Sequence, residues 1–240
     1  MDSDDEALPR YLQQLWGIDT GRRRGPKPSL AIEDIGLAAV EVADRDGIET
    51  VSMKSMAAIL GISTMSIYRY LESKEELVSL MLHVAYGRPE LAPMPDADWR
   101  ARLRQWADAL AARLIEHPWI VTVPLASPPL EPNVLRWTEA GLQVLSTSTL
   151  APEQQFSALL VVDGFVRSQV SLSLQLGTVG AGRKPDRRVA DYPRRIAALV
   201  DAETFPILAG SGQTPPSEDF HGDQYGFGMN VILSGLDSLA

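Results

Sequence analysis

The residues around Gly61 constrain the fold of this chain more than any other part of its sequence. Two short helical patterns meet there, one beginning after Ser52 and the other after Ser63, and serine is favoured at a helix N-terminus. The tight turn Gly61-Ile62-Ser63 joins them, and Ala57 falls where the helices would cross, so a bulky side chain there would push them apart. Two helices joined in this way form a helix-turn-helix, whose second helix enters the major groove of DNA.

The second helix of this motif carries side chains suited to DNA on its predicted outer surface. Ile67 and Leu71 are predicted to face the core. The other positions supply hydroxyl groups for phosphates, an arginine for a phosphate or a guanine edge, and apolar groups for thymine methyls. These residues are Thr64, Met65, Ser66, Tyr68, Arg69 and Tyr70. Lys74 and the helix N-terminus add positive potential. The alternative is a simple corner between two helices that binds no DNA.

The net charge of −9 is unevenly distributed along the chain. Residues 1–19 have a net charge of −4, residues 20–88 are neutral, and residues 89–240 have a net charge of −5. The neutral part contains a basic arm without any anion, formed by Arg22, Arg23, Arg24 and Lys27. Because the local field decides whether a polyanion can dock, the total charge does not exclude DNA binding. The arm is either a solvated charge run or a contact to phosphates or the minor groove.

Helical spacing of apolar residues continues on both sides of the motif. Residues 1–28 are predicted to be an extension with a short apolar stretch, and the proline-containing stretch 87–98 marks a boundary. Beyond it, helices are predicted over 99–116, 133–145, 189–200 and 223–239, whereas 201–222 is predicted to be mostly irregular. The segment 153–176 fits a buried strand or a buried helix, and a helix is favoured because nothing else in the chain resembles a sheet. The predicted fold class is therefore all-α.

Several short motifs, taken together, resemble the TetR (tetracycline-repressor) family of bacterial regulators. The matching residues are Asp46-Gly47-Ile48, Met56-Ala57, Leu60-Gly61-Ile62, Ile67-Tyr68-Arg69-Tyr70 and Ser73-Lys74-Glu75-Glu76-Leu77. The last motif also has the pattern of a capping box that opens the next helix. The resemblance implies a three-helix helix-turn-helix domain over 29–87, with DNA contacts at Lys54, at the outward residues of the second helix and at Lys74.

Residues 96–240 resemble the tetracycline-repressor-like C-terminal domain through fewer motifs. The matching pieces are His117-Pro118-Trp119, residues 133–137, residues 162–166 and residues 225–230. The resemblance implies a larger helical domain that binds a ligand and forms a homodimer. From the residues, we expect the segment 153–176 to pair across a two-fold axis with a seam of Tyr225, Met229, Ile232, Leu236 and Leu239. Gly228 and Gly235 are expected to allow close approach of backbones at this interface.

Four side chains are candidates for an effector site, namely Trp106, Trp137, Asp163 and Phe165. Each also has a structural interpretation, the aromatic residues as core and the aspartate as a hydrogen-bonded group within an apolar run. The chain has no cysteine, no Gly-x-Ser-x-Gly motif and no metal-spaced histidine pair. We therefore expect no enzymatic activity, no metal and no cofactor.

These observations together predict a cytoplasmic, homodimeric transcriptional regulator. The N-terminal segment MDSDDEALPR is acidic, unlike a signal peptide, and no apolar run approaches the ~20 residues needed to span a bilayer. A repressor that leaves a palindromic operator when a small, largely apolar effector binds is favoured, and an activator or an effector-free architectural protein stays open. The alternative from another class is a helical small-molecule-binding protein or enzyme whose N-terminal module is a protein adaptor.

Overall fold

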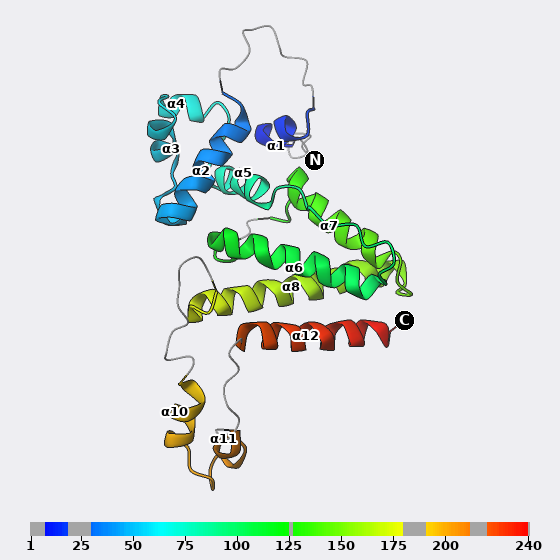
Figure 1. The fold of residues 1–240 in the computed structure, drawn as a ribbon. Helices are drawn as coiled ribbons and strands as arrows, with labels where there is room; N and C mark the ends of the chain where they lie inside the picture. Colours follow the sequence, from blue (N-terminus) through cyan, green and yellow to red (C-terminus); the bar gives the residue numbers. More distant parts are fainter. Residues whose placement is uncertain (1–7, 19–29, 125–126, 180–190, 212–219, 240) are drawn as a thin grey trace, which may run out of the picture. The chain divides into compact units, whose positions relative to one another are not determined.

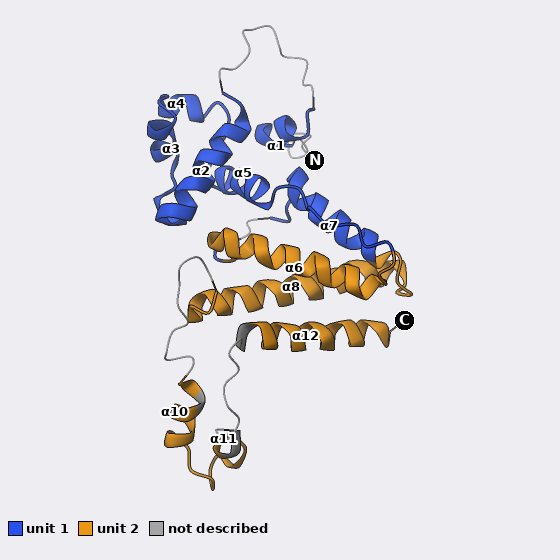
Figure 2. Ribbon diagram, viewed as in Figure 1, with its two compact units in different colours: residues 1–95, 122–144 blue, residues 96–121, 145–240 orange. Residues whose placement is uncertain are grey.

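The structure, a computed structural model, describes residues 8–18, 30–124, 127–179, 191–211 and 220–239. Its contacts divide the chain into two compact units (Figure 2). Unit 1 comprises residues 1–95 and 122–144, and unit 2 comprises residues 96–121 and 145–240. Every regular element in the described residues is a helix (Figure 1), which confirms the predicted all-α fold. No helix in this described part combines the length and the apolar character that a membrane span requires.

Unit 1 is built from short helices around a small core. They are α1 (Arg10–Leu15), α2 (Ile32–Asp46), the 3-10 helix η1 (Ile48–Thr50), α3 (Met53–Ile59), α4 (Thr64–Ile67), α5 (Lys74–Tyr86) and α7 (Pro132–Leu145). α2 packs on α5 around the fully buried Ile35 and Leu77. A Cβ atom added at Gly36 would lie 2.6 Å from Cγ2 of Val84 and 3.1 Å from Cγ of Leu80. The glycine is therefore required for the close approach of these two helices.

Serine side chains fix the start of three helices in unit 1. The hydroxyl groups of Ser52, Ser63 and Ser73 each accept a hydrogen bond from the backbone N–H three residues further along the chain. The capping box predicted at Ser73 is only half formed. The carboxylate of Glu76 accepts a hydrogen bond from the N–H of Glu72 at 2.6 Å, and therefore reaches the residue before the cap instead of the cap itself.

α1 is an integral part of unit 1, and the prediction that residues 1–28 form only an extension is wrong for this segment. Tyr11 and Leu12 are 5% and 2% exposed. The hydroxyl of Tyr11 donates to Oε1 of Glu131 at 3.0 Å, and the indole N–H of Trp16 donates to the carbonyl of Leu130 at 3.0 Å. These bonds join segments more than 100 residues apart, so no local pattern in the sequence indicates them.

α7 also packs within unit 1, although the sequence places it inside a single C-terminal domain over 96–240. The indole N–H of Trp137 donates to the carbonyl of Tyr86 at 3.1 Å, and the side-chain amide of Asn133 donates to the carbonyl of His83 at 2.8 Å. The division by contacts thus differs from the predicted one in α1 and α7. The predicted boundary over 87–98 includes Pro95, the residue after which the chain first passes from unit 1 to unit 2.

Unit 2 is built around one long helix. Its elements are α6 (Trp99–Glu116), η2 (Pro118–Val121), α8 (Pro152–Leu176), α10 (Tyr192–Leu199), α11 (Pro206–Ser211) and α12 (Phe220–Asp237). α8 packs on both α6 and α12 (Figure 1), and its 25 residues confirm the helix favoured for 153–176. α10 and α11 pack on each other. α11 lies in the segment predicted to be mostly irregular, which is a correction of that prediction.

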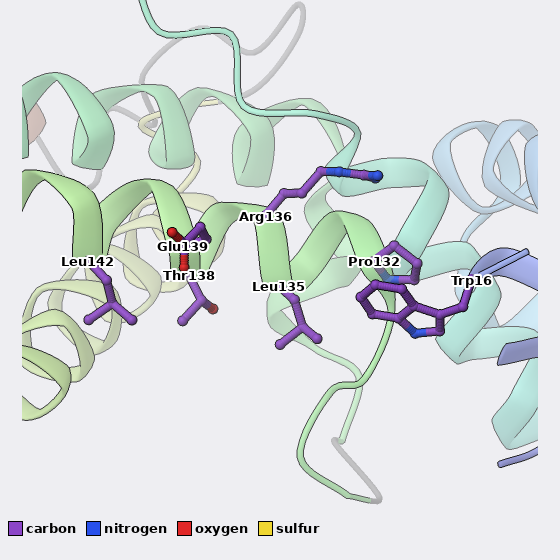
Figure 3. A pocket seen from close by; sticks show the side chains of 7 residues that line it. All are labelled: Trp16, Pro132, Leu135, Arg136, Thr138, Glu139 and Leu142. Atoms are coloured by element: carbon purple, nitrogen blue, oxygen red, sulfur yellow. The ribbon is translucent and has the colours of Figure 1, made fainter. Parts of the chain in front are cut away.

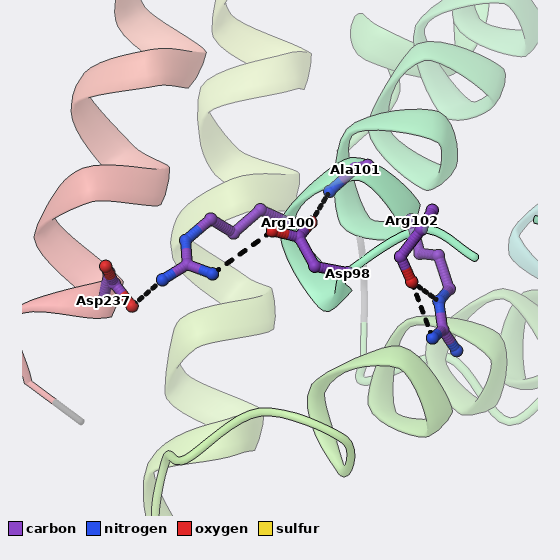
Figure 4. A network of polar contacts seen from close by, with 6 residues as sticks. Asp98, Arg100, Ala101, Arg102 and Asp237 are labelled. Carbon is purple, nitrogen blue, oxygen red and sulfur yellow. Dashed lines mark hydrogen bonds and ion pairs between the residues drawn. The ribbon is translucent and has the colours of Figure 1, made fainter.

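An ion pair joins the start of α6 to the end of α12 (Figure 4). Asp98 caps α6 by accepting a hydrogen bond from the backbone N–H three residues on, at 2.9 Å. The guanidinium of Arg100 pairs with Asp98 and with Asp237, the last residue of α12. Arg102 donates to the backbone carbonyl that precedes the cap, at 2.8 Å. These bonds fix the register of α12 against α6.

The seam that the sequence predicts for a dimer faces the core of unit 2 instead. Met229 is fully buried and Leu236 is 8% exposed. The hydroxyl of Tyr225 donates to Oδ1 of Asp108 at 2.8 Å, and its ring stacks on Phe165 with the centroids 5.8 Å apart. The seam is therefore wrong as a dimer face at Tyr225, Met229 and Leu236, because α12 packs against its own chain there, whereas its last residue, Leu239, is exposed beyond the end of α12.

The apolar side chains that α12 exposes lie on another face. Phe227 and Val231 are 70% and 54% exposed. Gly235 shares this face, and a Cβ atom added there would meet no atom within 4 Å. A Cβ atom at Gly228 would lie 2.5 Å from the ring of Phe165. The two glycines thus differ, since only Gly228 permits a close contact within the chain.

Candidate nucleic-acid interface

The helix-turn-helix predicted around Gly61 is formed by α3, the turn and α4, which lie together at one edge of unit 1 (Figure 1). Gly61 has a φ of +65°, a left-handed conformation that favours glycine. The N–H of Ile62 donates to the carbonyl of Ala57 at 3.0 Å, which closes the turn. Ala57 is 3% exposed, so the small side chain lies inside, as the crossing of the helices requires.

The predicted recognition helix is shorter than expected, because α4 ends at Ile67 and residues 68–71 follow it outside the helix. Ile67 and Leu71 are fully buried, as predicted. Met65 and Tyr68 are 74% and 47% exposed, and Arg69 is also exposed. Exposing two large apolar side chains to water is unfavourable in a free protein, and such residues mark contact surfaces when they gather in one place. The open side of α4 thus offers the apolar and cationic groups suited to a DNA groove.

Two of the predicted contact residues also form local hydrogen bonds within unit 1, and a third is half-buried. The hydroxyl groups of Ser63 and Ser66 are 2.8 Å apart, so Ser66 takes part in the cap of α4. The half-buried Tyr70 donates its hydroxyl to the carbonyl of Leu30 at 3.3 Å, just before α2. Thr64, the first residue of α4, is half-buried as well. Nothing in the sequence indicates the bond from Tyr70, which joins the turn after α4 to the residues before α2.

Three exposed cations lie in or next to the helix-turn-helix. Lys54 of α3, Arg69 and Lys74 are exposed, and none of them forms an ion pair with another described residue. By contrast, Arg45 pairs with Asp46 at 2.7 Å at the end of α2. Unpaired cations are free to replace counterions on phosphates. The basic arm Arg22, Arg23, Arg24 and Lys27 lies outside the described residues.

Comparisons with known proteins agree with this geometry. Residues 35–81 match the family described as "Bacterial regulatory proteins, tetR family", and residues 92–239 match "Tetracyclin repressor-like, C-terminal domain". The chain belongs to the TetR family. It is similar to the HTH-type transcriptional repressor DrrR1 of Streptomyces coeruleorubidus, with 35% identity over 239 residues, 97% of this chain and 86% of the relative.

Two further TetR-family relatives cover most of this chain. The HTH-type transcriptional repressor Rv1353c of Mycobacterium tuberculosis is 29% identical over 85% of this chain and 80% of its own length. The crystal structure of the TetR family protein ActR of Streptomyces coelicolor in complex with actinorhodin has a TM-score of 0.75, 19% identity and coverage of 88% and 98% of the two chains. This TetR-family protein is accordingly a DNA-binding transcriptional regulator.

The residues predicted for the effector site belong to both units. Trp106, Asp163 and Phe165 belong to unit 2, whereas Trp137 belongs to unit 1. Trp106 and Trp137 are 2% and 4% exposed, and the indole of Trp137 is bonded to the backbone of α5. Asp163 pairs with Arg167 of the same helix at 2.7 Å, and both are half-buried. Of these four residues, only Asp163 and Phe165 are partly exposed to solvent.

A groove of about 390 Å³ runs along α7 in unit 1 (Figure 3). Leu135, Thr138 and Leu142 line it from one face of the helix, and Trp16 lies beside Pro132 at one end. The helical spacing of the α7 residues was visible in the sequence. The contribution of Trp16 was not, because it depends on the docking of α1.

Proposed function

We propose that this TetR-family protein acts as a homodimer on a palindromic operator, with α4, Lys54 and Lys74 of each copy at one half-site. The open side of α4 carries the proposal, because Met65 of α4 and the next residues Tyr68 and Arg69 are exposed, whereas Ile67 and Leu71 are fully buried. Thr64, Ser66 and Tyr70 are further proposed contacts through their exposed portions. The basic arm at 22–24 is proposed to bind phosphates or the minor groove nearby.

Dimerisation explains how an effector could control such a protein. Two recognition helices must lie about 34–36 Å apart to meet successive major grooves. An effector that binds more tightly to a dimer with another spacing lowers the affinity for the operator by its differential affinity for the two states. We propose a small, largely apolar effector that binds within residues 96–240, with Asp163 and Phe165 in contact with it and Trp106 packed behind them. Trp137 is then a core residue of unit 1.

The proposed dimer face combines α8 and α12. Phe156 and Leu160 of α8 are 52% and 58% exposed and lie four residues apart on one face, and Leu172 is 49% exposed further along the helix. On α12 the exposed Phe227 and Val231 are spaced in the same way. Covering these two stripes with a second copy across a two-fold axis produces a four-helix interface.

Single substitutions on the open side of α4 test the DNA assignment. Fluorescence anisotropy with the DNA upstream of the protein's own gene should show that Tyr68→Ala or Lys74→Ala weakens binding by ~1–3 kcal/mol without loss of helical circular dichroism. Arg45→Ala is the matched control, because Arg45 is exposed but already paired with Asp46. Wild-type affinity in both test variants would remove α4 from the interface. Binding of a protein from the same cells, with no affinity for this DNA, would favour the adaptor alternative.

A further inference from the structure

A second hollow of about 420 Å³ lies in unit 1, between η1, the first turns of α5 and the segment that leads into α7. Its walls are apolar at Ile48, Val78 and Leu82. Leu82 is 5% exposed, so this wall is part of the packed core, whereas Ile48 and Val78 are half-buried. A hollow of this size and composition is in the range of small-molecule sites.

The charged residues of the hollow are mostly acidic. Glu49, Glu75 and Glu131 line it, and Lys74 is the cation among its lining residues. Glu49 and Glu75 are exposed at the surface, whereas Glu131 is 3% exposed. The three carboxylates outnumber the lysine, so the field inside the hollow favours a cation and disfavours a phosphate or a carboxylate.

Glu131 is the residue that points to a ligand. Its hydrogen bond within the described part of the chain comes from the hydroxyl of Tyr11, at 3.0 Å, and it forms no ion pair with any described lysine, arginine or histidine. A carboxylate taken out of water without a cationic partner loses much of its hydration free energy. An ammonium group carries a positive charge and donates up to three hydrogen bonds, so it would supply the cationic partner that this carboxylate lacks among the described residues.

We propose that this hollow binds an amphipathic organic cation, an amine carried on a compact apolar ring system. The ammonium group pairs with Glu131, and the ring system packs against Val78 and Leu82. Glu49 and Glu75 attract the cation to the entrance. This site is separate from the effector site proposed within residues 96–240, and binding to it requires no DNA. Its test is therefore independent of the proposed DNA interface.

Isothermal titration calorimetry on the full-length chain, without DNA, tests the proposal with three probes of one shape. They are 1-naphthylmethylamine, which is cationic at neutral pH, neutral 1-naphthylmethanol and anionic 1-naphthylacetate. We expect the amine to bind at least about tenfold more tightly than the other two, because only the amine forms the ion pair. Glu131→Gln should remove this preference. Glu139→Gln is the matched control on α7, because Glu139 is exposed and lines the other groove.

Two further variants keep the test decisive if Glu131→Gln does not fold. Val78→Trp, at a half-buried position of the wall, should fill the hollow and abolish binding of the amine while helical circular dichroism is unchanged. Glu49→Gln combined with Glu75→Gln should weaken binding at low salt more than at high salt. Equal affinity for the three probes, no binding of the amine, or wild-type binding by Val78→Trp would overturn the proposal.

Discussion

Gly235→Arg should convert the protein from dimer to monomer without unfolding it. Gly235 lies in α12 on the exposed face that also carries Val231, and a Cβ atom there would meet no atom within 4 Å. The arginine side chain therefore has room in the isolated protomer. In the proposed dimer the same position faces the second copy, so each interface would contain the guanidinium groups of both copies.

The expected magnitude follows from the chemistry of that face. Its neighbours on α12 are apolar, so a guanidinium enclosed there finds no carboxylate on the exposed stripe. An uncompensated charge in such a contact costs ~3–5 kcal/mol. Since each 1.4 kcal/mol is a factor of ten, one such charge should raise the dissociation constant of the dimer by about 10² to 4 × 10³-fold, and the guanidinium of the second copy should add to this rise. Operator affinity should then fall steeply, because each half-site would have to be bound independently.

Sedimentation velocity across a dilution series measures the first effect, and anisotropy with operator DNA measures the second. Gly235→Ala is the matched control: it adds a methyl group in open space, should stay dimeric, and should stabilise α12 by about 1 kcal/mol. The contrast is Gly228→Ala, which should lower thermal stability because its Cβ atom would lie 2.5 Å from Phe165. A Gly235→Arg variant that stays dimeric with intact operator affinity would refute the assignment of this face.

Three more predictions concern the arm, the core and the pH dependence of unfolding. Alanine at residues 22–24 should reduce the slope of log affinity against log salt by about 0.9 per lost phosphate contact, and an unchanged slope would leave the arm as a solvated tail. Gly36→Val should destabilise the protein by ~1–3 kcal/mol in thermal unfolding, because its side chain would meet Val84 at the contact of α2 and α5, and an unchanged melting temperature would contradict that packing. Burial raises the pKa of Tyr11 and of Tyr225 in the folded protein, so these two hydroxyl groups ionise at a lower pH in the unfolded chain. The free energy of unfolding should therefore fall as the pH rises above ~10. A free energy of unfolding that does not change with pH in this range would argue against the burial of the two tyrosines.

The helix-turn-helix could be predicted from the sequence because its determinants are local. Ser52 and Ser63 cap helices through bonds to residues three positions away, and Gly61 supplies the left-handed conformation of the turn. The same locality explains why the buried Ile67 and Leu71 were placed correctly. Each of these assignments depends on spacing within one or two helical turns, which a sequence displays directly.

The contacts of α1 and α7 could not be predicted, because they depend on long-range pairs. Tyr11 meets Glu131 and Trp16 meets Leu130 across more than 100 residues. Neither pair leaves a periodic signal, and a short apolar stretch before a basic arm is equally compatible with a free extension. The hollow beside Glu131 was missed for the same reason, since its walls come from η1, α5 and the segment before α7.

The prediction of the dimer seam failed for a different reason, because two of the helices are apolar on two faces. α8 buries Val162, Val166 and Val170 against its own unit and still exposes Leu160 and Leu172. α12 likewise presents one apolar face to α8 and another to solvent. Periodicity detects both faces but not which of them the chain covers by itself, and the sequence pattern selected the inner one. Because the inner face of α12 is already filled by its own chain, only the outer stripe is free to pack against a second copy.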